Sequence, residues 1–220
     1  MSSFPNSPRV LKGGLVVLAP AGTTVRRVIA LQYNPDSLTR SYQVQGTGGE
    51  SGTDRAQPFR LKGPAIESIK LEAEIDATDQ LEFPDQNPVA TSVGLAPQIA
   101  SLEALVNPTG AELLAVKADA EGGTLEIMPP EAPLVLFVWS RNRIAPVRVT
   151  EFSVTEEAFD PALNPIRAKV SLGLRVLTTD DLGYSHRGGT LFLAYLRTRE
   201  SLAGRVPGAT LQALGVPALP

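Results

Sequence analysis

Residues 146–176 read PVRVTEFSVTEEAFDPALNPIRAKVSLGLRV. The second half alternates apolar with charged or small residues, which is the period of a strand with one buried face. Its apolar members are Ile166, Ala168, Val170, Leu172, Leu174 and Val176. The first half alternates with a small slip at Val147, Val149, Phe152 and Val154. Between them, DPALNP is rich in residues that favour turns, so the segment predicts a long antiparallel hairpin.

Five further strands are predicted outside this hairpin. They are LKGGLVVLAP (11–20), VRRVIALQYNP (25–35), LTRSYQVQ (38–45), AIESIKLEAEIDATD (65–79) and APLVLFVWS (132–140). The second pairs with the first and stops at Asn34-Pro35, where proline fixes φ and removes a donor while Asn favours the turn. In the fourth, Ile69, Leu71 and Ala73 face one side and the charged residues face the other.

Two segments have helical spacing. In 97–107, PQIASLEALVN follows a proline suited to a first helical turn; residues 111–120 either extend this helix or form a separate turn. In GGTLFLAYLRTRESLAGRVPG (188–208), apolar and small residues fall at Leu191, Ala194, Tyr195, Thr198 and Leu202. We therefore expect a mainly β fold, an antiparallel barrel or sandwich with one inserted helix and a short C-terminal helix.

The chain divides into two predicted parts. Residues 1–185 form the β domain, with 1–10 flexible and the polar tract 46–57 a mobile loop, and residues 186–220 form the C-terminal helix and a Pro/Gly-rich tail.

Composition narrows the classes of function. The 220 residues are 43% hydrophobic and 20% charged with a formal charge of −3, as in a soluble globular protein without attraction to nucleic acid. There is no cysteine, which excludes disulfides, thiolate nucleophiles and Cys-based metal sites. No secretory signal is visible, and no apolar run reaches the roughly 18 residues of a membrane helix.

Catalytic patterns are sparse. His186 is the single histidine and no G-x-S-x-G elbow accompanies it, so we interpret it as a solvated linker residue before Gly188. The tract GTGGESG lacks the Gly-Lys-Ser/Thr ending of a phosphate loop, and Glu50 and Asp54 would repel phosphate. We expect no catalytic, cofactor-binding or metal-binding residues and no enzymatic activity.

Seven carboxylates lie between residues 66 and 86, with Lys70 as the one base. They are Glu67, Glu72, Glu74, Asp76, Asp79, Glu82 and Asp85. A glycosidase pair or a calcium loop is the alternative, but aromatic residues are 5% of the chain and DATD lacks EF-hand spacing. We interpret the segment as a solvated or partner-facing acidic strand.

The arginines form two groups. Arg141, Arg143 and Arg148 surround the start of one strand, and Arg187, Arg197, Arg199 and Arg205 surround the C-terminal helix. Separate acidic and basic patches suit copies that pack head to tail or side by side, because unlike charges attract across such a contact. Ordinary mixing of surface charge is the alternative.

Four motifs follow one another along the chain in an order typical of one protein family. They are LQYNPDSLTRSY, GPAIESIKLEAEIDATD ending in T-D, PPEAPLVLFVWS ending in Trp-Ser, and the F-D-x-x-x-x-P-x-R-A-x-V-x-L hairpin, which is the most specific. Over residues 28–178 the chain resembles the tube-like N-terminal domain of contractile injection system baseplate proteins, a family of tube and hub adaptors that often carry a LysM domain. After Gly204 only 16 residues follow, RVPGATLQALGVPALP, too few for a LysM domain.

The resemblance implies a structural role. It implies a tube-like β-barrel, a ring that is usually hexameric, joining the inner tube protein to the trimeric hub and spike and to other baseplate proteins. Assembly would be cytoplasmic, within a phage-tail-like particle that the cell retains or releases, without membrane or nucleic acid as partner. The alternative is a stand-alone β-sandwich binding module, for example for carbohydrate, although Trp139 in its apolar strand is expected to be buried rather than a sugar platform.

Overall fold

A computed structural model describes residues 11–19, 24–46, 61–123 and 132–219. It contains one seven-stranded antiparallel sheet in the order β2-β1-β5-β6-β7-β4-β3. The strands are β1 (Gly14–Leu18), β2 (Val25–Ala30), β3 (Leu38–Gln43), β4 (Ile66–Asp76), β5 (Val135–Ser140), β6 (Arg143–Phe159) and β7 (Pro165–Val176). All seven coincide with predicted strands, so the mainly β antiparallel class is confirmed.

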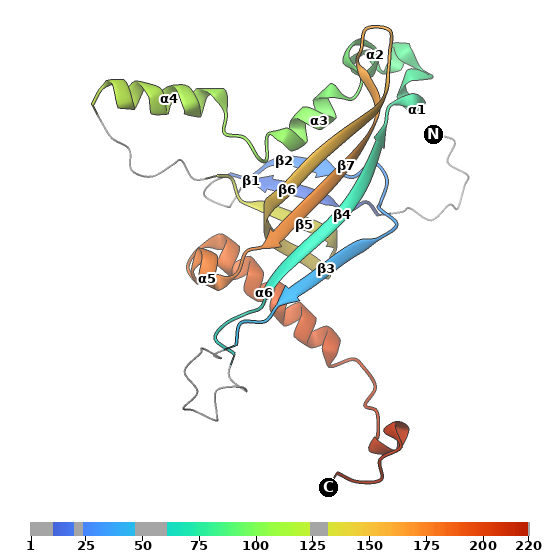
Figure 1. The fold of residues 1–220 in the computed structure, drawn as a ribbon, viewed down its shortest axis with the longest axis vertical. Helices are drawn as coiled ribbons and strands as arrows, with labels where there is room; N and C mark the ends of the chain where they lie inside the picture. The colour runs from blue at the N-terminus through green and yellow to red at the C-terminus, as the bar shows by residue number, and fades with distance from the viewer. Residues whose placement is uncertain (1–10, 20–23, 47–60, 124–131, 220) are drawn as a thin grey trace.

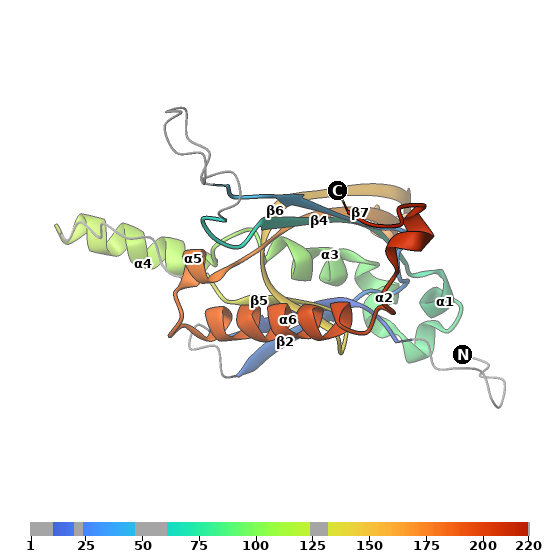
Figure 2. The same cartoon turned by 90° about the horizontal axis from the view of Figure 1, so that it is seen from below.

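The longest strand, β6, joins two halves of the sheet. Its first residues, Arg143 to Val147, pair with β5, and the stretch from Val147 to Phe159 pairs with β7. Register shifts along β6 add to its bending. Figure 2 shows the result, with β4 and β7 in one layer and β2 and β5 in another. Within the described residues β2 and β3 do not pair with each other, so the sheet is open and the expected barrel is not closed.

The main core fills the space between these layers. It joins Leu15 and Phe137 from one layer to Ile69, Leu172 and Leu174 from the other, all at most 2% exposed. In Figure 2, α3 (Ala96–Glu103) appears between the two layers, and α6 (Arg187–Ala203) runs at the level of the layer that holds β2 and β5. They contribute Ile99 and Leu102, and Phe192 and Tyr195, to the same core. The C-terminal helix therefore packs onto the β domain, while the predicted boundary at residue 186 stays a prediction.

The helices differ from the prediction of one inserted and one short terminal helix. Between β4 and β5 lie α1 (Thr78–Leu81), η2 (Pro84–Gln86), α2 (Pro88–Val93), α3 and α4 (Gly110–Glu121). Residues 111–120 thus form a separate helix, which begins with a capping box between Thr109 and Glu112 and projects from the body (Figure 1). After β7 come α5 (Thr179–Leu182), the 17-residue α6, which is not short, and η3 (Leu211–Leu214).

The Asn34-Pro35 corner ties the two layers together through amide side chains. Asn34 Oδ1 accepts a hydrogen bond from the Gly13 backbone N–H at 2.9 Å, and Asn34 Nδ2 donates to the Leu11 carbonyl at 2.8 Å. Gln32 makes the same pair of bonds to the backbone of Asp76 at the end of β4, at 2.7 and 2.9 Å. Each side-chain amide bonds to backbone groups as the backbone of a neighbouring strand would. The corner therefore holds β1 and β4 in place where strand pairing stops.

The hairpin turn between β6 and β7 is closed by Asp160. Its carboxylate accepts from the backbone N–H groups of Ala162 and Asn164, both at 2.8 Å, and from Asn164 Nδ2 at 2.7 Å. The Asn164 side chain and backbone are the main reason that the Asp160 pKa lies below its ordinary value. These bonds support Leu163 at a positive φ of 65°. The predicted DPALNP turn is confirmed.

The predicted flexible residues 1–10 and nearly all of the predicted loop 46–57 lie outside the described residues. At its edge, Gly46 forms an isolated antiparallel bridge to Leu61. No helix in the described part of the chain is both apolar enough and long enough to span a bilayer.

Candidate functional site

A buried carboxylate, Glu67, lies where β3, β4 and α6 meet. Its side chain is 3% exposed and accepts hydrogen bonds from Tyr42 Oη at 2.8 Å and from Tyr195 Oη at 3.0 and 3.1 Å. Arg40 and Arg199 each approach through Nη1, at 3.4 and 3.2 Å. Two phenols and two guanidinium groups therefore surround one carboxylate, which satisfies its oxygens inside the fold.

Strand periodicity and helical spacing bring these five residues together. Glu67 has the same parity as Ile69 and Leu71, so it points to the core face of β4. On β3, Tyr42 pairs directly with Glu67 and Arg40 lies two residues earlier, on the same face. On α6, Tyr195 and Arg199 are four residues apart and share a helix face.

The phenols are held in their protonated, donating form. Partial burial, followed by the hydrogen bond to Glu67, raises the pKa of Tyr42 to about 12. Burial and the charge of Glu67 raise the pKa of Tyr195 as well. Both hydroxyls thus remain donors to Glu67 at neutral pH.

The rings fix the Arg199 guanidinium in position. It lies 5.0 Å from the centroid of the Tyr42 ring and 5.4 Å from that of Tyr195, within the range of cation–π contact. Arg40 lies 5.7 Å from the Tyr42 ring. Because the rings and Glu67 hold these cations, the two guanidinium groups are ordered before any partner arrives.

A cleft of about 380 Å³ opens above this network, between β3, the β5–β6 turn and α6. Its lining comprises Arg40, Ser140, Asn142, Arg143, Tyr195, Arg199 and Leu202. Arg143 has no ion pair with any described residue. Three guanidinium groups therefore stand against the single carboxylate of Glu67, and the cleft is positive. We call it the arginine cleft.

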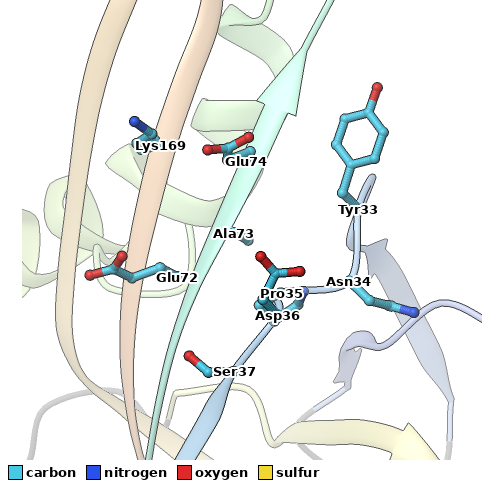
Figure 3. Close-up of a pocket in the computed structure, with 9 residues that line it drawn as sticks. All are labelled: Tyr33, Asn34, Pro35, Asp36, Ser37, Glu72, Ala73, Glu74 and Lys169. Atoms are coloured by element: carbon cyan, nitrogen blue, oxygen red, sulfur yellow. The ribbon is translucent and has the colours of Figure 1, made fainter.

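A second hollow, of about 330 Å³, lies at the Asn34-Pro35 corner on the other face of β4 (Figure 3). Three of its lining residues are acids, Asp36, Glu72 and Glu74, and none of them has an ion pair with a described residue. The basic lining residue, Lys169, is already paired with Glu157 at 2.8 Å. Tyr33, 48% exposed, stands at its rim. We call this hollow the acidic groove.

The seven carboxylates of residues 66–86 do not act as one surface. Glu72, Glu74, Asp79, Glu82 and Asp85 are exposed as predicted. Asp76 is half-buried and pairs with Arg167 at 2.8 Å; burial alone would raise its pKa, but bonds from Thr78 and Arg167 outweigh burial and lower it. Glu67 is the exception: the prediction of a solvated carboxylate is wrong for this residue, because it is buried.

Two of the remaining residues singled out in the sequence have structural roles. His186 is the N-cap of α6 and accepts a hydrogen bond from the Gly188 N–H at 3.1 Å through Nδ1. Trp139 is half-buried and stacks on Phe137 with centroids 5.9 Å apart. The tract GTGGESG lies outside the described residues, apart from Gly46. In the part of the chain that is described, no three acidic or histidine side chains gather as metal ligands would.

No protein-family model matches the chain, and no curated protein matches its sequence. Among solved structures, a chain from the tail of an empty GTA particle, computed with helical refinement and C6 symmetry, aligns with 11% identity. The alignment covers 74% of this chain and 90% of that chain with a TM-score of 0.30. A TM-score this low does not establish a shared fold.

Proposed function

We propose that this protein is a structural subunit of a contractile injection system baseplate, which forms a ring between the inner tube and the hub and spike. In this role it acts through assembly and not through catalysis. The hexameric state, the tube, hub and spike partners and assembly in the cytoplasm are parts of the proposal that follow from the motif order in residues 28–178.

The observation that carries the proposal is a pair of sheet edges, the outer edges of β2 and β3, with which no described strand pairs. Residues of β2 are almost all exposed, with Val25 at 55% and Val28 at 63%. At the other end, β3 has four exposed residues out of six. Uncovered edges with apolar residues invite pairing with another chain, and monomeric proteins usually blunt them. A curved open sheet with two such edges suits a subunit that is completed by its neighbours.

Two of the motifs behind the resemblance support the same role, because both form part of the framework. The QYNP corner links β1 to β4, and the F-D-x-x-x-x-P turn closes the β6–β7 hairpin through Asp160. Residues at such corners fix the course of strands rather than carry out a reaction. The proposal thus rests on architecture and on free edges.

The test is incorporation into particles. Phage-tail-like particles purified from cells that encode this chain should contain it, and a tagged copy should appear by electron microscopy at the baseplate end of the tube. Deletion of the chain should leave tubes without an attached hub. Particles that assemble completely without the chain would refute the proposal, and specific capture by a glycan array would favour the binding-module alternative.

A further inference from the structure

We propose that the arginine cleft of one copy binds the acidic groove of a second copy, so that the chain associates head to tail. The inference deepens the proposed function, on which it rests, by naming the surfaces through which neighbouring subunits meet. The ligand of the arginine cleft is a cluster of carboxylates on a folded surface, and that surface belongs to another molecule of this chain.

The arginine cleft is built to receive carboxylates. Arg40 and Arg199 each contact Glu67 through one guanidinium nitrogen, Nη1. Arg199 also makes cation–π contacts with the Tyr42 and Tyr195 rings. A guanidinium has five N–H donors in a rigid fork, so most donors of both remain for a carboxylate from outside. Arg143, half-buried at the opposite wall, has no ion pair within the described chain, and Asn142 and Ser140 add polar groups.

The acidic groove has the complementary composition. Asp36, Glu72 and Glu74 are three carboxylates without an ion pair to a described residue, against three arginines in the cleft. Lys169, which forms its ion pair with Glu157 and also attracts Glu74, offsets one of the three charges, so the groove keeps a net negative charge. The exposed ring of Tyr33 is of the residue type that most often anchors protein interfaces, alongside arginine.

The two surfaces lie on opposite faces of the same part of the sheet. Arg40 points to the face shared with Glu67 and Ile69, whereas Glu72 and Glu74 point to the other face of β4. One copy therefore cannot bring its own cleft and groove together. Contacts between two different surfaces are heterologous, and they generate rings when the rotation closes. The arrangement suits a ring of identical subunits.

The experiment is a charge swap followed by analytical ultracentrifugation over a range of protein and salt concentrations. Arg143→Glu reverses a cleft charge without touching Glu67, and Glu74→Arg reverses a groove charge. We expect wild-type association to weaken with added salt, and each single variant to associate at least about tenfold more weakly. The double variant, and an equimolar mixture of the two single variants, should recover association, because both recreate unlike charges at every contact.

Arg148→Glu and Glu156→Arg serve as matched controls, since both residues are exposed on β6 and line neither hollow. Circular dichroism and thermal melting establish that each variant is folded. Single variants that associate like the wild type would overturn the inference, as would a double variant and mixture that both stay dissociated. A wild-type chain that remains monomeric near about 1 mM at low salt would overturn it as well.

The inference and the proposed function fail separately. A chain that associates through this charge pair but is missing from purified particles removes the baseplate role and leaves the contact. A chain present at the baseplate whose ring is insensitive to Arg143→Glu and Glu74→Arg removes the contact and leaves the role.

Discussion

Replacement of Glu67 by alanine tests whether the buried carboxylate organises the junction of β3, β4 and α6. The Tyr195 hydroxyl would lose its acceptor in a residue that is 3% exposed, which costs about 1–3 kcal/mol. Arg40 and Arg199 would each lose an ion pair, but their side chains are 30% and 38% exposed. Solvent screening therefore limits each pair to about 0.5–1 kcal/mol. The free energy of unfolding should fall by about 3 kcal/mol in all.

Urea unfolding followed by Trp139 fluorescence measures this loss, since Trp139 is the single tryptophan and stacks on Phe137. For a chain of this size the melting temperature should fall by roughly 6–12 °C. Glu67→Gln keeps the shape and one acceptor, so it should cost about half as much. The matched control is Glu156→Ala on β6, an exposed strand glutamate, which should change stability by less than about 0.5 kcal/mol. A Glu67→Ala loss no larger than that of the control would refute the reasoning.

Three further predictions concern the corner, the loop before α3 and the phenol. Gln32→Ala removes two hydrogen bonds to Asp76 and should lower the free energy of unfolding by about 1–3 kcal/mol, whereas Gln43→Ala, which loses no described bond, should be near neutral in the same urea assay. Gly94→Ala should lower the free energy of unfolding by at least about 2 kcal/mol, because Gly94 has φ +57° and an added Cβ would collide with the Pro165 carbonyl. Gly122→Ala is the control and should not lower it, since Gly122 has φ −74° and an added Cβ would meet no described atom closer than 3.4 Å. Equal melting temperatures for the two variants would contradict this prediction. Because the pKa of Tyr42 is raised in the folded chain, its protonated phenol contributes its full stabilisation below about pH 10, and this contribution should disappear as the pH rises through about 12. The melting temperatures of the wild type and Tyr42→Phe should therefore converge over that pH range. A constant difference between them would exclude the effect.

The strands were predictable because alternation reports burial directly. In β4, Ile69, Leu71, Ala73 and Ile75 are buried and the residues between them are exposed or half-buried, as the period requires. Glu67 carries the same signal, since its odd number places it on the Ile69 face. Its charge indicates a solvated residue, whereas its parity alone predicts that it points inward. Its partners Tyr195 and Arg199 lie more than a hundred residues away, and no local pattern reveals them.

The helices of residues 78–121 were mostly missed because they are short. α1 has four residues and α2 has six, so neither completes the two turns that make a period of 3.6 visible. Prolines at the start of α2 and α3 look like breaks between elements, although proline is favoured in the first turn. Thr109 with Glu112 was a readable capping box and could have identified α4 as a separate helix.

Closure of the sheet was not readable from the sequence, because it depends on whether two distant edges meet. β2 and β3 are predicted as strands in the same way as the interior strands, but one ends the sheet beside β1 and the other beside β4. The arginine cleft could not be predicted from the sequence for the same reason. Two groups along the chain were recognised, but only the fold selects Arg143 from one and Arg199 from the other and adds Arg40 from β3.

The register of β4 links stability to assembly. One face of this strand supplies Glu67, which holds Arg40 and Arg199 of the cleft, and the opposite face supplies Glu72 and Glu74, which the cleft of a neighbouring copy would bind. A slip of one residue would exchange the two faces, placing Glu67 in solvent and the groove acids in the core. The nine residue pairs with β7 and the bonds from Gln32 to Asp76 oppose such a slip. The QYNP corner therefore bears on assembly without touching a partner, because it holds the strand that positions both charged surfaces.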